Sequence, residues 1–288
     1  MTILVTGILL AGTYALIAMG LTLQYGVARI MNLANGEIFV AACFAAYWLF
    51  TVQGVNPLVG LLLVAPAAFA ASGLIYRVLL RPLVHRARHR GQLEIDSIFA
   101  TFGLLFLFQG FMQLTFGGAY TSYTFLDDRF TSLGDAYALN RVVAFGAAAA
   151  IAVALYAFLF HTRHGTAMRA VAADPETAKL VAIDVDRTAL AAFALGGALT
   201  ASGGVLLSTF YTFNASMGVV LTIKALIVVI MGGVGDVRGA VLAALVLGIS
   251  ETAVATLIDP GLTLAATYSL FILILLFRPQ GLYGKRAS

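Results

Sequence analysis

Residues 3–25 read Ile-Leu-Val-Thr-Gly-Ile-Leu-Leu-Ala-Gly-Thr-Tyr-Ala-Leu-Ile-Ala-Met-Gly-Leu-Thr-Leu-Gln-Tyr and contain no charged side chain. A helix needs about 20 apolar residues to cross the hydrocarbon core of a bilayer, so this stretch predicts a membrane-spanning helix. The sequence predicts nine such spans: Ile3–Tyr25, Ile38–Val52, Pro57–Tyr76, Ser97–Phe116, Arg141–Phe160, Thr188–Ser208, Val219–Gly233, Gly239–Ile258 and Leu262–Phe277. The alternating pattern of a transmembrane barrel is absent from the sequence. We therefore expect one all-α polytopic membrane domain, residues 1–288, with about 8–10 transmembrane helices.

The composition supports this fold class. Hydrophobic residues make up 61% of the 288 residues and charged residues 10%, against about 45–50% and about 25% in soluble domains. The mean hydropathy of +0.98 agrees. With so few charges, a soluble fold of this size is excluded. The single cysteine, Cys43, excludes a disulfide framework, a cysteine-based zinc site and an iron–sulfur cluster.

The basic residues predict the orientation, because cytoplasmic loops carry an excess of Lys and Arg. With the N-terminus outside, 14 of the 17 basic residues fall on the inner side. Only Arg129 and Arg141 fall outside, and Lys224 lies within a span. We expect the N-terminus outside, the C-terminus in the cytoplasm, and two long charged inner loops, Leu80–Asp96 and His161–Arg187.

Enzyme motifs are missing from the sequence. It contains neither a nucleotide-binding phosphate loop nor a His-Glu-x-x-His zinc motif. The four histidines, His85, His89, His161 and His164, all fall in predicted cytoplasmic basic loops. An intramembrane enzyme needs a catalytic pair, and the spans offer none. We expect no catalytic residue, no bound metal or cofactor, and no nucleic-acid partner.

Polar residues interrupt the apolar sequence between the first two spans, at Gln24, Asn32, Asn35 and Glu37. Asn35-Gly36 is a turn signal, and Glu37 follows in the first turn of the next helix, where the helix dipole favours an acid. One interpretation is a broken, re-entrant passage whose backbone groups line a cavity. The other is an ordinary cytoplasmic turn, with Arg29 and Glu37 among the lipid headgroups.

Two charges fall inside predicted spans. Lys224 and Glu251 lie about six and seven residues from the outer ends of neighbouring antiparallel spans, so each is roughly 9–11 Å deep. Pairing them would relieve the cost of inserting each charge into lipid, about 2.5–3.5 kcal/mol. We favour a structural ion pair over a pair on a translocation path. Lys224 pointing outward to the headgroups is a further possibility.

The inner loop 161–187 contains a helix start. Asp174-Pro175-Glu176 has the pattern of an N-cap, a proline at the first helical position and an acid in the first turn. The short helix that follows suits either the membrane surface or a groove on a cytoplasmic partner.

Seven segments of the chain form an ordered set: Gly20-Leu21-Thr22-Leu23-Gln24-Tyr25-Gly26, Asn32-Leu33-Ala34-Asn35-Gly36-Glu37, the run Arg163–Ala172 continuing to Ala178 and Ile183-Asp184-Val185, Lys224-Ala225, Gly232-Gly233-x-Gly235 with Gly239-Ala240, Glu251-Thr252, and Arg278-Pro279-Gln280-Gly281-Leu282-Tyr283-Gly284. Taken together, they resemble the first permease subunit of bacterial branched-chain amino acid ABC importers. They follow the family's order across nearly the whole chain. Asn35 replaces the usual histidine and Asp236 a usual serine.

The resemblance implies a pore subunit in the bacterial inner membrane. It also implies a second related permease subunit, two cytoplasmic ATPase subunits that hold ATP and Mg, and an external substrate-binding protein. On this basis we expect ATPase coupling through Arg163, Gly165, Arg169, Asp174, Pro175 and Glu176. We expect the substrate path at Gln24, Tyr25, Asn32, Asn35, Glu37 and Thr101.

Two alternatives stay open at this point. Related permeases carry urea, short amides or other small polar solutes, and the sequence does not separate these cargoes. A stand-alone secondary transporter or channel is the other possibility. The predicted spans contain few acidic residues that could relay protons or sodium ions, which argues against this second alternative.

Overall fold

The computed structural model describes residues 2–87, 89–126, 129–132 and 135–283. Twelve α-helices and two short strands make up this part of the chain. They are α1 Thr2–Ala28, α2 Asn35–Gln53, α3 Pro57–Ile75, α4 Arg81–Arg86, α5 Arg90–Phe116, β1 Arg129–Ser132, β2 Asp135–Ala138, α6 Leu139–His161, α7 Arg163–Ala173, α8 Pro175–Leu180, α9 Val185–Ser208, α10 Met217–Gly232, α11 Val237–Leu257 and α12 Thr263–Phe277. A π-helical turn, η1 Tyr76–Leu80, joins α3 to α4, and a 3₁₀ turn, η2 Pro260–Leu262, precedes α12.

Each predicted span corresponds to a helix, which confirms the all-α polytopic fold. Eight helical segments of the described chain are long and apolar enough to cross a membrane, and α10 is a shorter apolar helix of 16 residues. The prediction of a long inner loop at Leu80–Asp96 is wrong. Helix continues from α3 through η1 to Arg86, and α5 already begins at Arg90. The charged residues there lie on helix ends because a helix does not stop at the edge of its apolar stretch.

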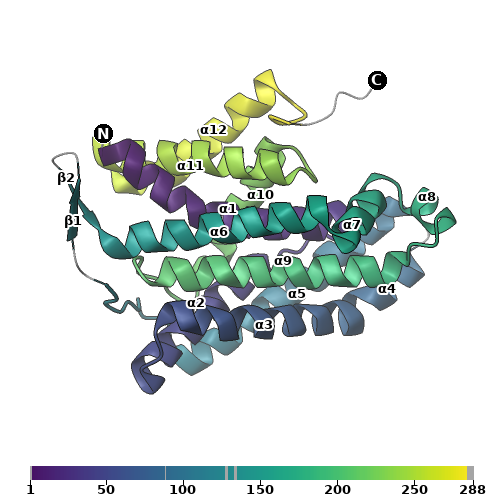
Figure 1. Ribbon diagram of the computed structural model, residues 1–288, viewed down its shortest axis with the longest axis horizontal. Helices are drawn as coiled ribbons and strands as arrows, with labels where there is room; N and C mark the ends of the chain where they lie inside the picture. The colour runs from purple at the N-terminus through teal and green to yellow at the C-terminus, as the bar shows by residue number, and fades with distance from the viewer. Residues whose placement is uncertain (1, 88, 127–128, 133–134, 284–288) are drawn as a thin grey trace.

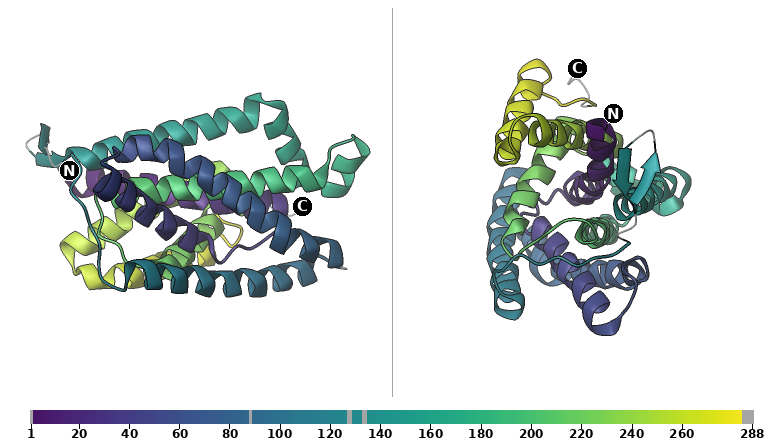
Figure 2. Two further views of the ribbon diagram at one scale, coloured as in Figure 1. Left: turned by 90° about the horizontal axis from the view of Figure 1, so that it is seen from below. Right: turned by 90° about the vertical axis from the view of Figure 1, so that its left-hand side faces the viewer.

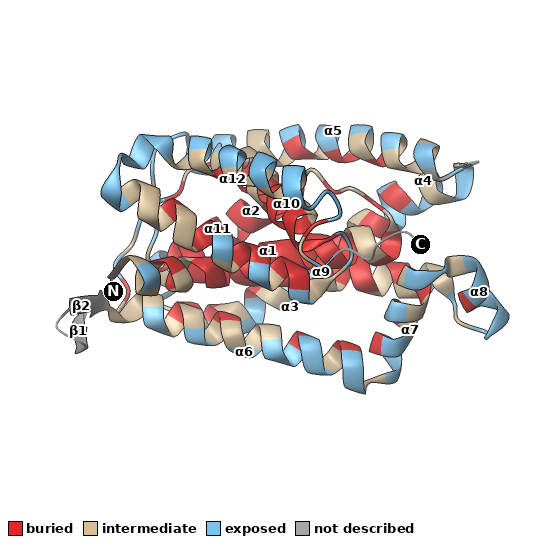
Figure 3. Ribbon diagram, turned by 90° about the horizontal axis from the view of Figure 1, so that it is seen from above, coloured by how far each residue is buried: buried red, intermediate tan, exposed pale blue. Residues whose placement is uncertain are grey.

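Helices α1 and α9 form the centre of the bundle, as Figures 1 and 2 show. Both are mostly buried, whereas α3, α5, α6 and α12 lie at the periphery and bury few of their residues (Figure 3). An apolar exposed face is expected where lipid or another subunit replaces water. The central helices approach closely because Gly20 and Gly196 face each other. A β-carbon on either glycine would lie about 2.5 Å or less from the other's carbonyl oxygen.

The two ends of the bundle differ. One end carries the N-terminus and the β1–β2 hairpin, whose register pairs Arg129 with Ala138. The other end carries α7, α8 and residues 278–283, with α8 reaching past the ends of the long helices (Figure 1). The start of α1 and residues 278–283 therefore lie at opposite ends of the bundle. That the N-terminus is outside stays a prediction from the basic residues.

Candidate functional site

The chain between α1 and α2 returns into the bundle. The Asn35 side-chain nitrogen, at the start of α2, donates to the carbonyl of Ile17 at 3.5 Å. Ile17 lies eleven residues before the end of α1, so α2 begins about 16 Å back along α1. Residues 29–34, which make this return, are non-helical, and none of them is exposed: Ile30, Asn32 and Ala34 are buried and the other three are partly buried. The break between α1 and α2 therefore has the geometry of the re-entrant passage. The alternative, a turn among headgroups, does not describe Glu37, which is fully buried.

Two threonines from other helices bind the backbone of this return segment. The Thr101 hydroxyl of α5 accepts from Leu33 N–H at 3.2 Å and lies 3.1 Å from the Met31 carbonyl. The Thr222 hydroxyl of α10 accepts from Gly36 N–H at 2.8 Å and donates to the Leu33 carbonyl at 3.1 Å. Buried backbone groups need such partners where no helix supplies them. The threonines therefore stabilise the break.

Amide side chains complete the network. The Asn32 side chain donates to Gln24 Oε1 at 3.0 Å and accepts from the backbone N–H of Ala34 at 3.1 Å. Gln24 in turn donates to the Phe193 carbonyl on α9 at 3.3 Å. Asn35 Oδ1 accepts from the Thr200 hydroxyl, also on α9, at 3.0 Å. The structure thus brings Gln24, Asn32, Asn35 and Thr101 together in the core.

Tyr25 lies apart from this network. Its hydroxyl donates to Glu94 Oε1 on α5 at 3.1 Å, and the residue is only partly buried. Of the six residues predicted for the substrate path, Tyr25 is the one that reaches the bundle surface. The other five are fully or almost fully buried within this chain. A solute therefore reaches them only if the surrounding helices separate.

Glu37 lies where the N-terminal ends of α2 and α10 meet. A β-carbon on Gly36 would fall 1.9 Å from the Gly218 carbonyl oxygen, and one on Gly218 would fall 2.2 Å from Glu37 Oε1. Among the described residues, neither carboxylate oxygen of Glu37 has a hydrogen-bond partner. Within the described ranges, the Ser216 side chain at the N-cap of α10 accepts no capping hydrogen bond. The positive ends of two helices favour the carboxylate electrostatically, but its hydrogen-bonding capacity is unused.

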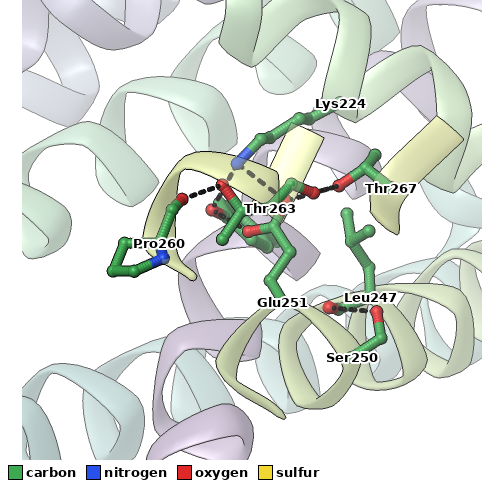
Figure 4. A network of polar contacts seen from close by, with 8 residues as sticks. Lys224, Leu247, Ser250, Glu251, Pro260, Thr263 and Thr267 are labelled. Atoms are coloured by element: carbon green, nitrogen blue, oxygen red, sulfur yellow. Dashed lines mark hydrogen bonds and ion pairs between the residues drawn. The ribbon is translucent and has the colours of Figure 1, made fainter. Parts of the chain in front are cut away.

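The predicted pair of intramembrane charges is present. Lys224 Nζ of α10 lies 2.7 Å from Glu251 Oε1 of α11. Tyr14 OH of α1 donates to Glu251 Oε2 at 2.8 Å, and Lys224 donates to the same hydroxyl at 3.1 Å. The Thr267 hydroxyl of α12 donates to Glu251 Oε1 at 2.7 Å. Figure 4 shows the Glu251 carboxylate between Lys224 and Thr267. The network joins four helices and leaves no oxygen of Glu251 unpaired, as expected of a structural ion pair.

The predicted coupling residues lie on the α7–α8 projection. Asp174 Oδ1 accepts from Glu176 N–H at 3.0 Å, with Pro175 as the first residue of α8. Arg163 is exposed at the start of α7, and Gly165 is buried at the corner between α6 and α7. At the far end of α8, Leu180 and Val181 are exposed by 85% and 66%. An exposed apolar tip of this kind suits contact with another protein.

Arg169 turns back toward the bundle instead of the tip. Its guanidinium lies over the Phe160 ring of α6, 4.6 Å from the centroid. Arg29, in the return segment, donates to the Ala172 carbonyl near the end of α7 at 2.7 Å. The projection is thus bonded directly to the break between α1 and α2.

Four residues that bind the return segment or the Lys224–Glu251 pair were not predicted from the sequence. Thr200, Thr222, Tyr14 and Thr267 belong to ordinary helical stretches, where a threonine or tyrosine gives no local signal. His89 accepts from Gln92 N–H and caps α5, and His85 Nε2 lies 3.0 Å from Asp186 Oδ2. These histidines have structural partners in the fold.

Known proteins of one family are similar to this chain over nearly its whole length. A family model described as the permease component of the branched-chain amino acid transport system matches residues 3–278. The high-affinity branched-chain amino acid transport permease LivH of Escherichia coli (strain K12) is 29% identical over 97% of this chain and 94% of its own. BraD of Pseudomonas aeruginosa, described in the same terms, is 30% identical over 98% of this chain and 95% of its own.

A solved structure shares the fold. PsaBC from Streptococcus pneumoniae, determined in complex with Fab, matches with a TM-score of 0.50 at 12% identity, over 98% of this chain and 94% of that one. The apolar helices and the permease relatives make this chain a multi-pass protein of the bacterial inner membrane. The chain belongs to the family of branched-chain amino acid transport permease components.

Proposed function

We propose that this chain is the pore subunit of an ABC importer that carries branched-chain amino acids into the cell. The observation that carries the proposal is the family match over residues 3–278, joined to an α7–α8 projection with an exposed apolar tip. ATP and Mg would bind to two separate ATPase subunits. A second, related permease would complete the pore, and an external binding protein would deliver the substrate.

The α7–α8 projection would contact the ATPase. Arg163, Asp174, Pro175 and Glu176 would form and orient the contact surface, with Leu180 and Val181 at its apolar tip. Gly165 and Arg169 would not contact the ATPase and would instead hold α7 against α6. The bond from Arg29 to the Ala172 carbonyl gives motion of α7 a direct route to the α1–α2 break. Packed elements of this kind move between discrete arrangements.

The substrate path would open beside that break. Separation of α2 from α10 would uncover Gln24, Asn32, Asn35, Glu37 and Thr101, with Tyr25 at the surface end. The unpaired Glu37 carboxylate would then be available to the ammonium group of an amino acid, and the apolar helix faces to its aliphatic side chain.

The proposal is tested by purifying the tagged chain from its native membrane and identifying the subunits that accompany it. We expect a second permease, an ATPase and a binding protein, and ATP-dependent leucine uptake once the complex is in liposomes. Charge reversal at Glu176, in the first turn of α8, should weaken ATPase recovery, whereas reversal at Asp259, in the loop between α11 and α12, should not. Recovery of the chain alone, with uptake that needs no ATP, would contradict the proposal.

A further inference from the structure

A second site lies between the second half of α7 and the bundle. Residues of α1, α6, α7 and the start of α11 enclose a cavity of about 270 Å³. Its walls are mainly apolar, with Leu23, Val27, Leu159 and Met168 among them, and two arginines, Arg169 and Arg238, lie in its lining. The function proposed above uses Arg169 only to hold α7 against α6 and assigns the cavity no ligand.

The two arginines converge on one aromatic ring. The guanidinium carbons of Arg169 and Arg238 lie 4.6 Å and 4.9 Å from the centroid of Phe160. Arg238 also lies over the Tyr156 ring and donates to the Tyr156 hydroxyl. The stacking holds two like charges on one side of the bundle, where each guanidinium still presents several N–H donors.

No carboxylate neutralises these charges within the described part of the chain, where neither guanidinium has an acidic oxygen within 4.0 Å. Asp236 is the one acidic residue in the cavity lining. Its Oδ1 accepts from the backbone N–H groups of Arg238 and Gly239 at 2.8 and 3.2 Å, so it serves as the cap of α11. The cavity therefore combines a surplus of positive charge with apolar walls.

We propose that this cavity binds the phosphate of an anionic phospholipid headgroup, with the arginines on the phosphate and the apolar walls against the glycerol and the first acyl carbons. The cavity lies at the bundle end that the basic residues place in the cytoplasm, where the leaflet is rich in anionic lipid. Basic pockets between transmembrane helices at that surface suit such headgroups. A bound lipid would bridge α7 to α6 and α11, and so brace the projection.

The test measures lipid binding to the full-length purified protein, with any subunits that accompany it, by native mass spectrometry after delipidation. The probes are phosphatidylglycerol and phosphatidylcholine with the same acyl chains. We expect preferential binding of phosphatidylglycerol. Arg169→Gln and Arg238→Gln should each weaken it about fivefold, which corresponds to about 1 kcal/mol per basic side chain. The double variant should show a larger loss than either single variant.

Matched controls separate this site from general surface charge. Arg187→Gln removes an exposed arginine that lies outside the cavity, and it should change binding less than twofold. Replacing both cavity arginines with lysine keeps the charge and should retain the preference for phosphatidylglycerol. Equal binding of the two lipids, an equal loss in Arg187→Gln, or displacement of the lipid by millimolar inorganic phosphate would each overturn the proposal. So would a double glutamine variant that keeps its lipid and loses only a protein partner.

Discussion

The carboxylate of Glu37 on α2 lies against Gly218 on α10, so closely that a β-carbon on Gly218 would fall 2.2 Å from Oε1. The contact joins the N-terminal ends of two helices that are far apart in the sequence. The buried carboxylate has no hydrogen-bond partner in the part of the chain that the structure describes, which costs stability. Costs of this kind persist mainly where function requires the group. Substitutions at Glu37 and Gly218 therefore test whether this chain gives up stability to keep a functional carboxylate.

Glu37→Gln should raise stability and lower transport. The neutral amide has the same shape and removes the cost of a buried unpaired charge, at least about 1 kcal/mol. Thermal unfolding in detergent and leucine uptake in liposomes measure the two effects. Glu37→Met, an apolar side chain of similar length, should behave in the same way. A lower melting temperature in both variants would mean that Glu37 has a stabilising partner in the complex.

Gly218→Ala should destabilise the protein by about 1–3 kcal/mol, because the added methyl group overlaps the Glu37 carboxylate. Shortening Glu37 to alanine in the same chain should recover part of that loss, since the overlap then disappears. A double-mutant cycle on unfolding free energies measures the coupling. Additive effects of the two substitutions would show that the methyl group meets something else.

Thr222→Val should destabilise the break between α1 and α2. The change keeps the shape of the side chain and removes the hydroxyl that serves Gly36 N–H and the Leu33 carbonyl. Leaving two buried backbone groups unpaired should cost about 1–3 kcal/mol. Thr256→Val, at an exposed position on α11 where the hydroxyl only returns to its own helix, is the control and should cost much less. Similar losses in the two variants would contradict this prediction.

Lys224→Met should be more harmful than the double change of Lys224→Met with Glu251→Gln. Removing the lysine alone leaves Glu251 charged and without its counter-ion, a loss of about 3–5 kcal/mol for a buried pair. The double variant removes both charges and keeps the Tyr14 and Thr267 hydroxyls as partners. Comparing melting temperatures of the three proteins decides the point. A single variant as stable as the wild type would place the pair in a solvated setting.

Arg29→Gly should weaken coupling without straining the fold. Arg29 has a φ of 57°, a left-handed conformation that glycine adopts readily, so the backbone of the return segment should persist. The bond to the Ala172 carbonyl is lost, and we expect ATP-driven uptake to fall by an amount equivalent to about 0.5–2 kcal/mol of coupling. ATPase recovery should be unchanged. Uptake at the wild-type rate would exclude this bond from the coupling route.

Much of the architecture follows from the order of residues alone. A run of apolar residues of sufficient length has one low-energy form in lipid, so the spans, and the pattern that starts α8 at Asp174, are readable locally. The pairing of Lys224 with Glu251 was also predictable, because two opposite charges at similar depth on adjacent helices have few other partners. The prediction of a long inner loop at Leu80–Asp96 was wrong because local hydropathy indicates where the hydrocarbon region ends, whereas the helix continues beyond it.

The polar core was decided by the tertiary structure. Asn32, Asn35 and Glu37 are visible in the sequence as polar residues in an apolar setting. The sequence does not decide between a re-entrant passage and a cytoplasmic turn for them. Their meaning depends on Thr101, Thr222 and Gly218, which lie on other helices and meet the return segment only when the bundle packs. Hydrophobic patterning is a property of one segment, whereas the pairing of a buried polar group depends on what every neighbouring segment brings to it.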